Sequence, residues 1–151
     1  MLFLLHSIDN ARDRQNLFDR LGRLDPSRAP RWGRLSAPQM LVHLCDQMRM
    51  PFNDHPSGPL FGPPRVPVLW EAFLYVLPWP KGVPGPREAF VTEPGVWADD
   101  LETLRRLVDE FLNADPERPW PVHPNWGRLS RRQWGVFCYR HFDHHLKQFG
   151  V

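Results

Sequence analysis

Two histidines near the end of the chain have the spacing of a helical metal-binding pair. The stretch around them carries Trp134, Cys138, His141, His145 and Phe149 at intervals of four, three, four and four residues. This spacing places both imidazoles on the face of a helix that turns toward the core. Imidazoles four residues apart can reach one ion, and neutral imidazole suits zinc, nickel, iron or copper. The pair therefore predicts a site for a divalent metal ion, with zinc and nickel favoured.

A third histidine, His43, lies in a second stretch with helical spacing. Met40 and Leu44 share its apolar face, which directs the His43 ring toward the interior. Metal sites in helix bundles are built from inward side chains on facing helices, and three protein ligands with one open position are typical of catalytic zinc. We predict that His43, His141 and His145 hold the ion and that water or substrate takes the remaining position.

Four further polar residues lie near this set in the sequence. A hydrogen-bond partner usually fixes the tautomer of a ligand histidine, and Asp46, Gln47 and Gln148 are candidates for that role. Asp46 is also the first candidate for a helper acid or base. His123, which leads into the last helix, is a candidate for the mouth of the site or for an added ligand. Polar residues of these types are more often simply solvated.

The same histidines allow interpretations without a metal. A His-x-x-x-His pair arises by chance in many helices, and a buried histidine is commonly a hydrogen-bonded core residue. Cys45 and Cys138 lie close to the ligand stripe, so a thiolate ligand or a nucleophile activated by His141 is a rival. Cysteines inside apolar stretches more often behave as small buried hydrophobes, and we expect no disulfide between these two.

Helical periodicity and capping residues predict four amphipathic helices. Two of them begin with a capping box, in which Ser36 precedes Gln39 and Ser130 precedes Gln133. Residues 53–95 are rich in Pro and Gly, which excludes a long regular element there apart from 68–77, a short helix or strand. We expect helices from after Ser7 to about Leu24, from Ser36 to Met50, from Trp97 through Phe111, and from Ser130 to Phe149.

These elements predict an all-α fold in one domain over residues 1–151. The expected architecture is a four-helix bundle with a long Pro-rich crossover between helices 2 and 3. The run Trp32–Ser36 (WGRLS) recurs as Trp126–Ser130, each time ahead of a helix with a candidate ligand. Either convergent capping chemistry or an ancient duplication explains this repeated sequence. A single short match favours convergence, because a duplication would repeat at a fixed period over a longer stretch. The crossover aromatics Trp70, Phe73, Tyr75 and Trp79 are candidates for pocket lining, and plain core packing is the commoner role for such residues.

Composition narrows the class of protein. The 151 residues carry a formal net charge of +2, with Arg residues spread among Asp and Glu, so no nucleic-acid partner is expected. The opening run Met1–Leu5 is too short for a signal peptide, and no apolar stretch reaches transmembrane length. We therefore expect a cytoplasmic protein with no membrane partner. A symmetric homodimer is the commonest assembly of soluble proteins and is compatible with this chain.

Together the motifs resemble the DinB-like (YfiT-like) superfamily of metal-binding four-helix bundles, and within it a bacterial family of unknown function. The resemblance covers nearly the whole chain. It rests on Trp32–Ser36 with Gln39–Leu41 and His43, on Pro78–Pro84, on His123–Gly127, and most strongly on the ending His141–Val151. The resemblance implies that His43, His141 and His145 match the three metal-binding histidines of the superfamily.

Relatives in that superfamily include thiol-dependent S-transferases and a thiol-dependent isomerase, whose metal binds and activates a low-molecular-weight thiol. The resemblance thus implies a metal-dependent enzyme, a transferase or a hydrolase, that activates a thiol or water to act on an unknown small molecule. The alternative is a non-catalytic ligand-binding or stress-related protein with the same pocket, in which His123 or Asp46 closes the coordination shell. A bundle without metal, its histidines bonded to backbone or Gln, is a third hypothesis.

Overall fold

A computed structural model describes residues 5–52, 67–83, 85 and 87–151 of the chain. Within these ranges the fold is mostly helical and includes a small two-stranded sheet. The α-helices are α1 (Ala11–Arg23), α2 (Ala37–Arg49), α3 (Pro67–Tyr75), α4 (Trp97–Asn113) and α5 (Arg131–Gln148). Two 3-10 helices, η1 (Met50–Phe52) and η2 (Arg87–Phe90), and the strands β1 (Val122–His123) and β2 (Gly127–Arg128) complete the described elements. The expectation of a mainly helical fold is confirmed, and the stretch 68–77 is largely helical, whereas residues 53–66 of the crossover lie outside the described ranges.

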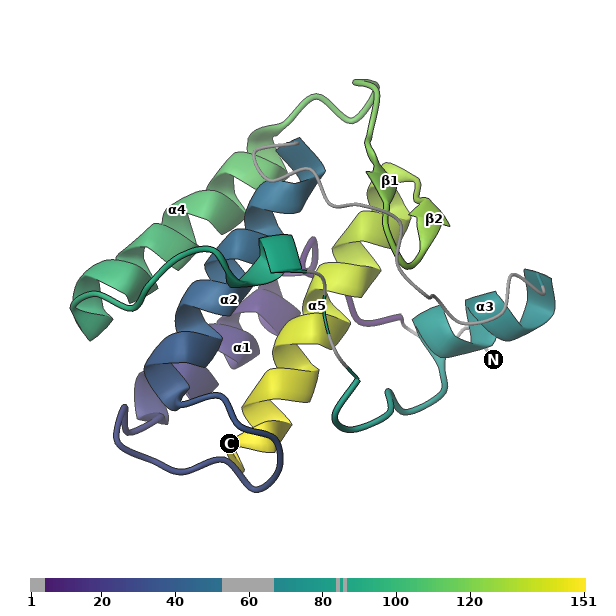
Figure 1. The fold of residues 1–151 in the computed structure, drawn as a ribbon. Helices are drawn as coiled ribbons and strands as arrows, with labels where there is room; N and C mark the ends of the chain where they lie inside the picture. The colour runs from purple at the N-terminus through teal and green to yellow at the C-terminus, as the bar shows by residue number, and fades with distance from the viewer. Residues whose placement is uncertain (1–4, 53–66, 84, 86) are drawn as a thin grey trace.

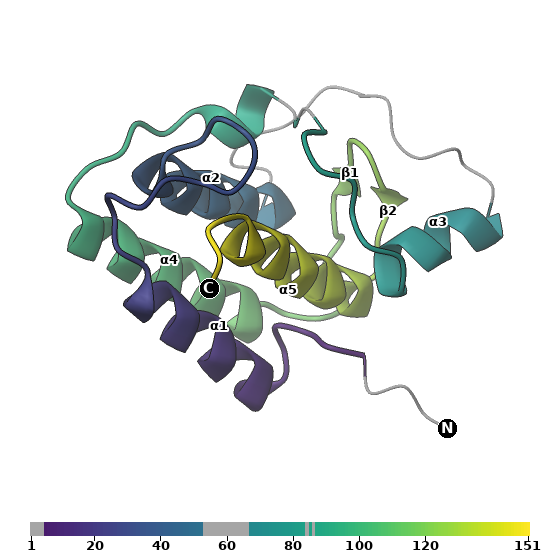
Figure 2. The same cartoon turned by 90° about the horizontal axis from the view of Figure 1, so that it is seen from below.

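Helix α2 lies at the centre of the fold. It packs against α4 on one side and α5 on the other, and both η1 and η2 contact it (Figure 1). Helix α1 packs on α5, on the side of the molecule opposite to η2 (Figure 2). Ten of the 13 residues of α2 are buried, so its polar side chains His43, Asp46 and Gln47 all lie inside the protein.

The two helices that carry the candidate ligands begin as the sequence predicts. The Ser36 hydroxyl accepts a hydrogen bond from the backbone N–H of Gln39, and the Gln39 side chain accepts one from the Ser36 N–H. Ser130 and Gln133 make the same reciprocal pair at the start of α5. Both capping boxes are therefore confirmed, and each satisfies two N–H groups that a helix end would otherwise leave unpaired.

The first helix begins three residues later than predicted. Its N-cap is Asn10, whose side chain accepts hydrogen bonds from backbone N–H groups of the first turn. The Ser7 N–H donates to the Asp13 carboxylate, and the Ile8 N–H donates to the Gly135 carbonyl on α5. These bonds hold the segment before Asn10 as a turn. Ile8 is fully buried although it is not part of a helix.

The small sheet corrects the all-α prediction. Strands β1 and β2 pair antiparallel, with Val122 opposite Arg128. Two-residue strands are too short to show an alternating pattern, so the sequence gives no strand signal here. The hairpin depends on its turn, because His123 Nδ1 accepts the backbone N–H groups of Asn125 and Trp126, and Gly127 adopts a φ of +70°.

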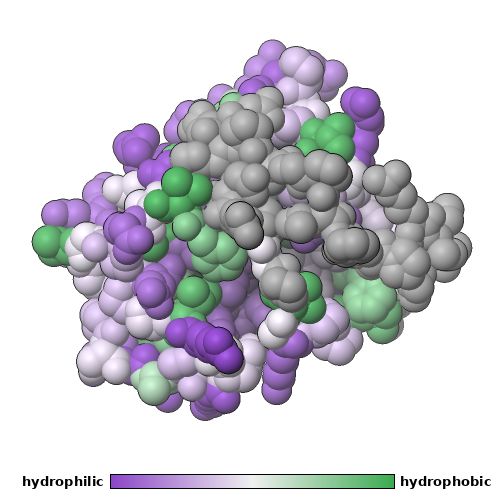
Figure 3. Space-filling model, viewed as in Figure 1, coloured by the Kyte–Doolittle hydropathy of each residue, from purple (hydrophilic) through white to green (hydrophobic). Residues whose placement is uncertain are grey.

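The core is mainly aliphatic with several aromatic side chains, and it lies between the four longest helices. Trp134, Phe111, Phe142 and Phe149 are its largest fully buried side chains. Among the described residues on the face shown in Figure 3, hydrophilic ones predominate and apolar ones form separate small patches. None of the helices in the described ranges is both long enough and apolar enough to cross a membrane.

Replacement of Ser130 by Ala tests the capping of α5. We expect Ser130→Ala to lower the free energy of unfolding by about 1 kcal/mol, because the Gln133 N–H loses its acceptor. Ser130→Asp keeps an acceptor at the N-cap. Because Asp and Ser are similarly good N-cap residues, its free energy of unfolding should stay within about a few tenths of a kcal/mol of wild type. Urea denaturation measures both, and equal losses in the two variants would contradict the capping account.

Candidate metal centre

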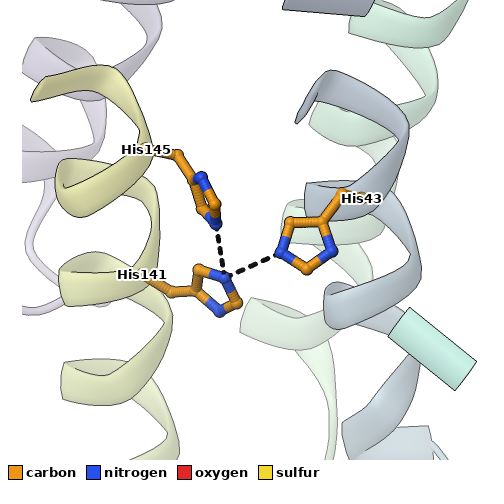
Figure 4. A group of neighbouring side chains, drawn as sticks. All are labelled: His43, His141 and His145. Carbon is orange, nitrogen blue, oxygen red and sulfur yellow. Dashed lines mark hydrogen bonds between the residues drawn. The ribbon is translucent and has the colours of Figure 1, made fainter. Parts of the chain in front are cut away.

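Three histidine rings from two helices converge in the interior. His43 comes from α2, and His141 and His145 come from α5 (Figure 4). The Nε2 atom of His141 lies 3.0 Å from Nε2 of His43 and 3.0 Å from Nε2 of His145. One nitrogen from each ring lies within 4.8 Å of the others, so the three can hold a metal ion. The structure brings together all three histidines proposed as ligands.

In two of the rings, the hydrogen bond of the nitrogen that faces away from the centre fixes the tautomer. It thereby decides that the other nitrogen points a lone pair at the centre. His43 Nδ1 lies 2.7 Å from the carbonyl oxygen of Ala89, which only accepts, so Nδ1 carries the proton. His145 Nδ1 lies 2.8 Å from Gln148 Oε1, and Gln148 Nε2 donates to the Trp32 carbonyl at 2.7 Å, which sets the orientation of the amide. His145 Nδ1 is therefore also the donor. The Nε2 atoms of both rings point at the centre without a proton.

The third ring cannot satisfy both of these lone pairs. A neutral His141 has one ring proton, and its Nε2 faces His43 and His145 at equal distances. At least one inward lone pair is thus left without a proton, and a cation is the natural complement. Two nitrogens on one tetrahedral zinc, each at roughly 2.0–2.1 Å, lie about 3.3–3.4 Å apart. Two of the three nitrogen pairs, at 3.0 Å, are close to that spacing, and all three nitrogens lie within 4.8 Å of one another. A small movement of the rings would therefore let one divalent ion reach all three.

Burial keeps the three imidazoles neutral. It is the largest cause that lowers the pKa of His43, against the opposing effects of the Ala89 carbonyl and Asp46. Burial, and then the neighbouring His43, lower the pKa of His145 to about 3. Burial and then the neighbours His145 and His43 hold the pKa of His141 well below its usual value. Neutral imidazole is the form that binds metals, so at neutral pH no proton has to leave these rings first.

Gln148 and Asp46 support the ligands in different ways. Gln148 bonds directly to His145. The Asp46 side chain is fully buried, and its Oδ2 accepts hydrogen bonds from the backbone N–H groups of Val91 and Thr92 at 2.8 and 2.9 Å. Those residues follow η2, so Asp46 holds the segment whose Ala89 carbonyl orients His43.

Gln47 and His123 lie beside the centre rather than in the ligand group. The Gln47 amide donates to the Cys138 sulfur at 3.8 Å, across the interface between α2 and α5. His123 is 3% exposed, and its Nδ1 accepts hydrogen bonds from its own hairpin instead of facing the three ligands. Burial lowers the pKa of His123 to about 3. The described ligand group contains neither residue.

The residues that sequence reasoning missed act through the backbone or by stacking. The Ala89 and Trp32 carbonyls fix two ring orientations, and no side-chain pattern signals a carbonyl. Phe90 stacks on His43 with ring centroids 4.3 Å apart. Among the crossover aromatics proposed as pocket lining, Trp79 lies 5.8 Å from the His141 ring. Aromatic rings from η2 and from the segment after α3 thus flank the centre.

Cysteine chemistry is disfavoured at this centre. Cys45 and Cys138 are both free and buried. Burial raises the pKa of each thiol to about 12, so neither is a thiolate at neutral pH. The described ligand group contains histidines alone.

No family model, curated protein or solved structure matches this chain.

Replacement of Gln148 tests its control of His145. We expect Gln148→Met to weaken metal binding by roughly 10- to 100-fold, because the His145 ring loses the acceptor that fixes its tautomer. Competition with a chelating dye measures the affinity. Gln15→Met, on the exposed face of α1, is the matched control and should bind metal as wild type does. Equal affinity of all three proteins would contradict this role of Gln148.

The buried His123 predicts a pH dependence of stability in the metal-free protein. Its folded pKa of about 3 lies below the ordinary value of 6.5, so the unfolded chain takes up a proton that the folded chain does not. Stability contributed by neutral His123 is complete above pH 6.5 and falls as the pH drops below it. The loss approaches about 1.4 kcal/mol per pH unit from this residue. Urea denaturation at several pH values from 5 to 7 gives the free energy of unfolding at each pH. This free energy should change less with pH in His123→Asn than in wild type. An equal change in the two proteins would contradict the low pKa of His123.

Proposed function

We propose that this chain is a metal-dependent protein of the DinB-like type, in which His43, His141 and His145 hold a divalent ion that activates a small thiol or water. In this proposal α1, α2, α4 and α5 form the four-helix bundle of that superfamily. The reaction class is S-transfer or hydrolysis. The observation that carries the proposal is the convergence of three Nε2 atoms that share too few protons to satisfy one another.

The number and charge of the ligands support a reactive rather than a structural ion. Structural zinc usually has four protein ligands, whereas the described group offers three. Three neutral imidazoles leave the charge of a bound ion undiminished. A divalent ion held there would lower the pKa of a thiol or water at an open position and so supply a nucleophile at neutral pH.

The residues around the centre support this chemistry by holding the ligands still. The Ala89 carbonyl and Gln148 fix the tautomers of His43 and His145, which keeps both Nε2 lone pairs inward. Phe90 and Trp79 flank the centre with apolar surface. Apolar walls limit the access of water, and electrostatic interactions are stronger where water is excluded.

A second candidate function is non-catalytic binding of a small ligand, as in a stress-related protein. The hydrogen bonds from the ligand histidines reach the Trp32 loop through Gln148 and the η2 segment through Ala89. An ion at the centre would therefore connect α2, α5 and both of these segments, and so stabilise the fold. This candidate needs the same three ligands but no bound nucleophile.

Cobalt substitution distinguishes the two candidates. We expect wild type to bind cobalt near one equivalent and to develop a thiolate-to-cobalt absorption band when 2-mercaptoethanol is added. His43→Ala, His141→Ala and His145→Ala should each lose cobalt binding, whereas the surface control His6→Ala should keep it. The loaded protein should then accelerate transfer of the thiol to 1-chloro-2,4-dinitrobenzene over the metal-free protein.

The other outcomes separate the candidates further. Cobalt binding without a thiol band, and without hydrolytic activity, would favour the non-catalytic protein. Retention of cobalt by all three His→Ala variants would contradict the three-histidine centre itself.

A further inference from the structure

Several buried polar atoms of the described residues, one of them on the ligand His141, have no hydrogen-bond partner. Within the described part of the chain these atoms are Gln47 Oε1, Asn125 Oδ1, Trp134 Nε1 and His141 Nδ1. Gln47 is 1% exposed and Trp134 is fully buried. Burial of a polar group without a hydrogen bond costs stability, so a group kept in this state calls for an explanation.

Three of these atoms belong to side chains on α2 and α5. The Gln47 amide contacts the Cys138 sulfur at 3.8 Å. Trp134, Cys138 and His141 follow one another on a single face of α5, at intervals of four and three residues. His141 shows its second nitrogen on the side of the ring away from His145, toward the earlier turns of α5 (Figure 4). The His141 ring therefore belongs both to the metal centre and to the set of side chains with unpartnered atoms.

The β1–β2 hairpin packs beside the same part of α5. The His123 ring lies 5.3 Å from the Trp134 ring and 4.6 Å from the Phe137 ring. The Asn125 N–H donates to His123 Nδ1 at 3.1 Å, which places Asn125 next to these rings. The unpartnered atoms thus come from α2, from α5 and from the turn of the β1–β2 hairpin.

The unpartnered atoms form a mixed set of donors and acceptors without charge. The Trp134 Nε1–H can only donate, and the carbonyl oxygens of Gln47 and Asn125 can only accept. When His141 Nε2 faces an ion, the single proton of the neutral ring is on Nδ1, which then donates. A neutral group that both donates and accepts, such as a carboxamide, is complementary to this set. An anion is not, because two of the atoms are acceptors.

We propose that Gln47, Trp134 and His141 line a polar subsite for the neutral, hydrogen-bonding tail of a small molecule whose other end reaches the metal centre. The subsite rests on the proposed function, since it requires an added ligand at the ion. It gives a role to the buried Gln47 amide, whose Oε1 has no hydrogen-bond partner among the described residues.

The test compares two thiols of nearly equal shape on cobalt-loaded protein. 2-Mercaptoacetamide carries a carboxamide, and 2-methyl-1-propanethiol carries methyl groups in place of its oxygen and nitrogen. Each is titrated into wild type, Gln47→Met and Gln15→Met, and the thiolate-to-cobalt band reports its affinity. Met has the unbranched shape of Gln without its polar atoms, and Gln15 lies on the exposed face of α1.

We expect Gln47→Met to weaken binding of 2-mercaptoacetamide about five- to tenfold and to change binding of 2-methyl-1-propanethiol by less than about twofold. The Tm of the metal-free variant should rise by roughly 2–4 °C, because an unpaired buried acceptor is removed. Gln15→Met should leave both affinities unchanged. Trp134→Phe, which removes the Nε1 donor, should weaken 2-mercaptoacetamide selectively as a second variant.

Other results overturn the subsite. Equal effects of Gln47→Met on the two thiols would do so while leaving the proposed function intact. A higher Tm with an unchanged affinity ratio would mean that these atoms hold buried water alone. Absence of the band with both thiols in wild type would contradict the thiol-binding function, and the subsite would fall with it.

Discussion

The centre depends on two hydrogen bonds that face away from it. The Ala89 carbonyl and the Gln148 amide oxygen each take the Nδ1 proton of a ligand histidine, which leaves an Nε2 lone pair pointing inward. Because His141 has a single proton to share between these lone pairs, the three rings cannot satisfy one another. Burial removes the alternative of protonation by lowering the pKa of all three rings. A cation is what remains to complete the cluster.

The rest of the fold keeps those two acceptors in place. Asp46 anchors the backbone after η2, and this anchor presents the Ala89 carbonyl to His43. The Trp32 carbonyl accepts from Gln148 and so orients the amide that meets His145. Gly33, next in the chain, has a φ of +80°, and a Cβ there would lie 2.5 Å from Gln148 Nε2. Loops before α2 and after η2 therefore position ligands on helices far from them in sequence.

Local patterns were enough to predict part of this arrangement. The spacing of His141 and His145 places them on one face because helix geometry is set by neighbouring residues, and the capping boxes at Ser36 and Ser130 are equally local. The sequence could not show that Ile8 bonds to α5 and delays α1, or that a turn at Gly127 pairs two short strands, because both depend on tertiary contacts. Every residue has a backbone carbonyl, so residue type cannot indicate that the Ala89 carbonyl accepts a hydrogen bond from His43. Gln47 was expected beside a ligand ring but contacts Cys138, since its direction depends on how α2 meets α5.

Anomalous diffraction from crystals grown with zinc tests the central claim most directly. Data collected on both sides of the zinc absorption edge locate the ion without reference to the protein atoms. We expect one strong peak at roughly 2.0–2.1 Å from Nε2 of His43, His141 and His145 together. A structure with all three rings ordered and no peak between them, or with zinc bound only elsewhere on the chain, would contradict it.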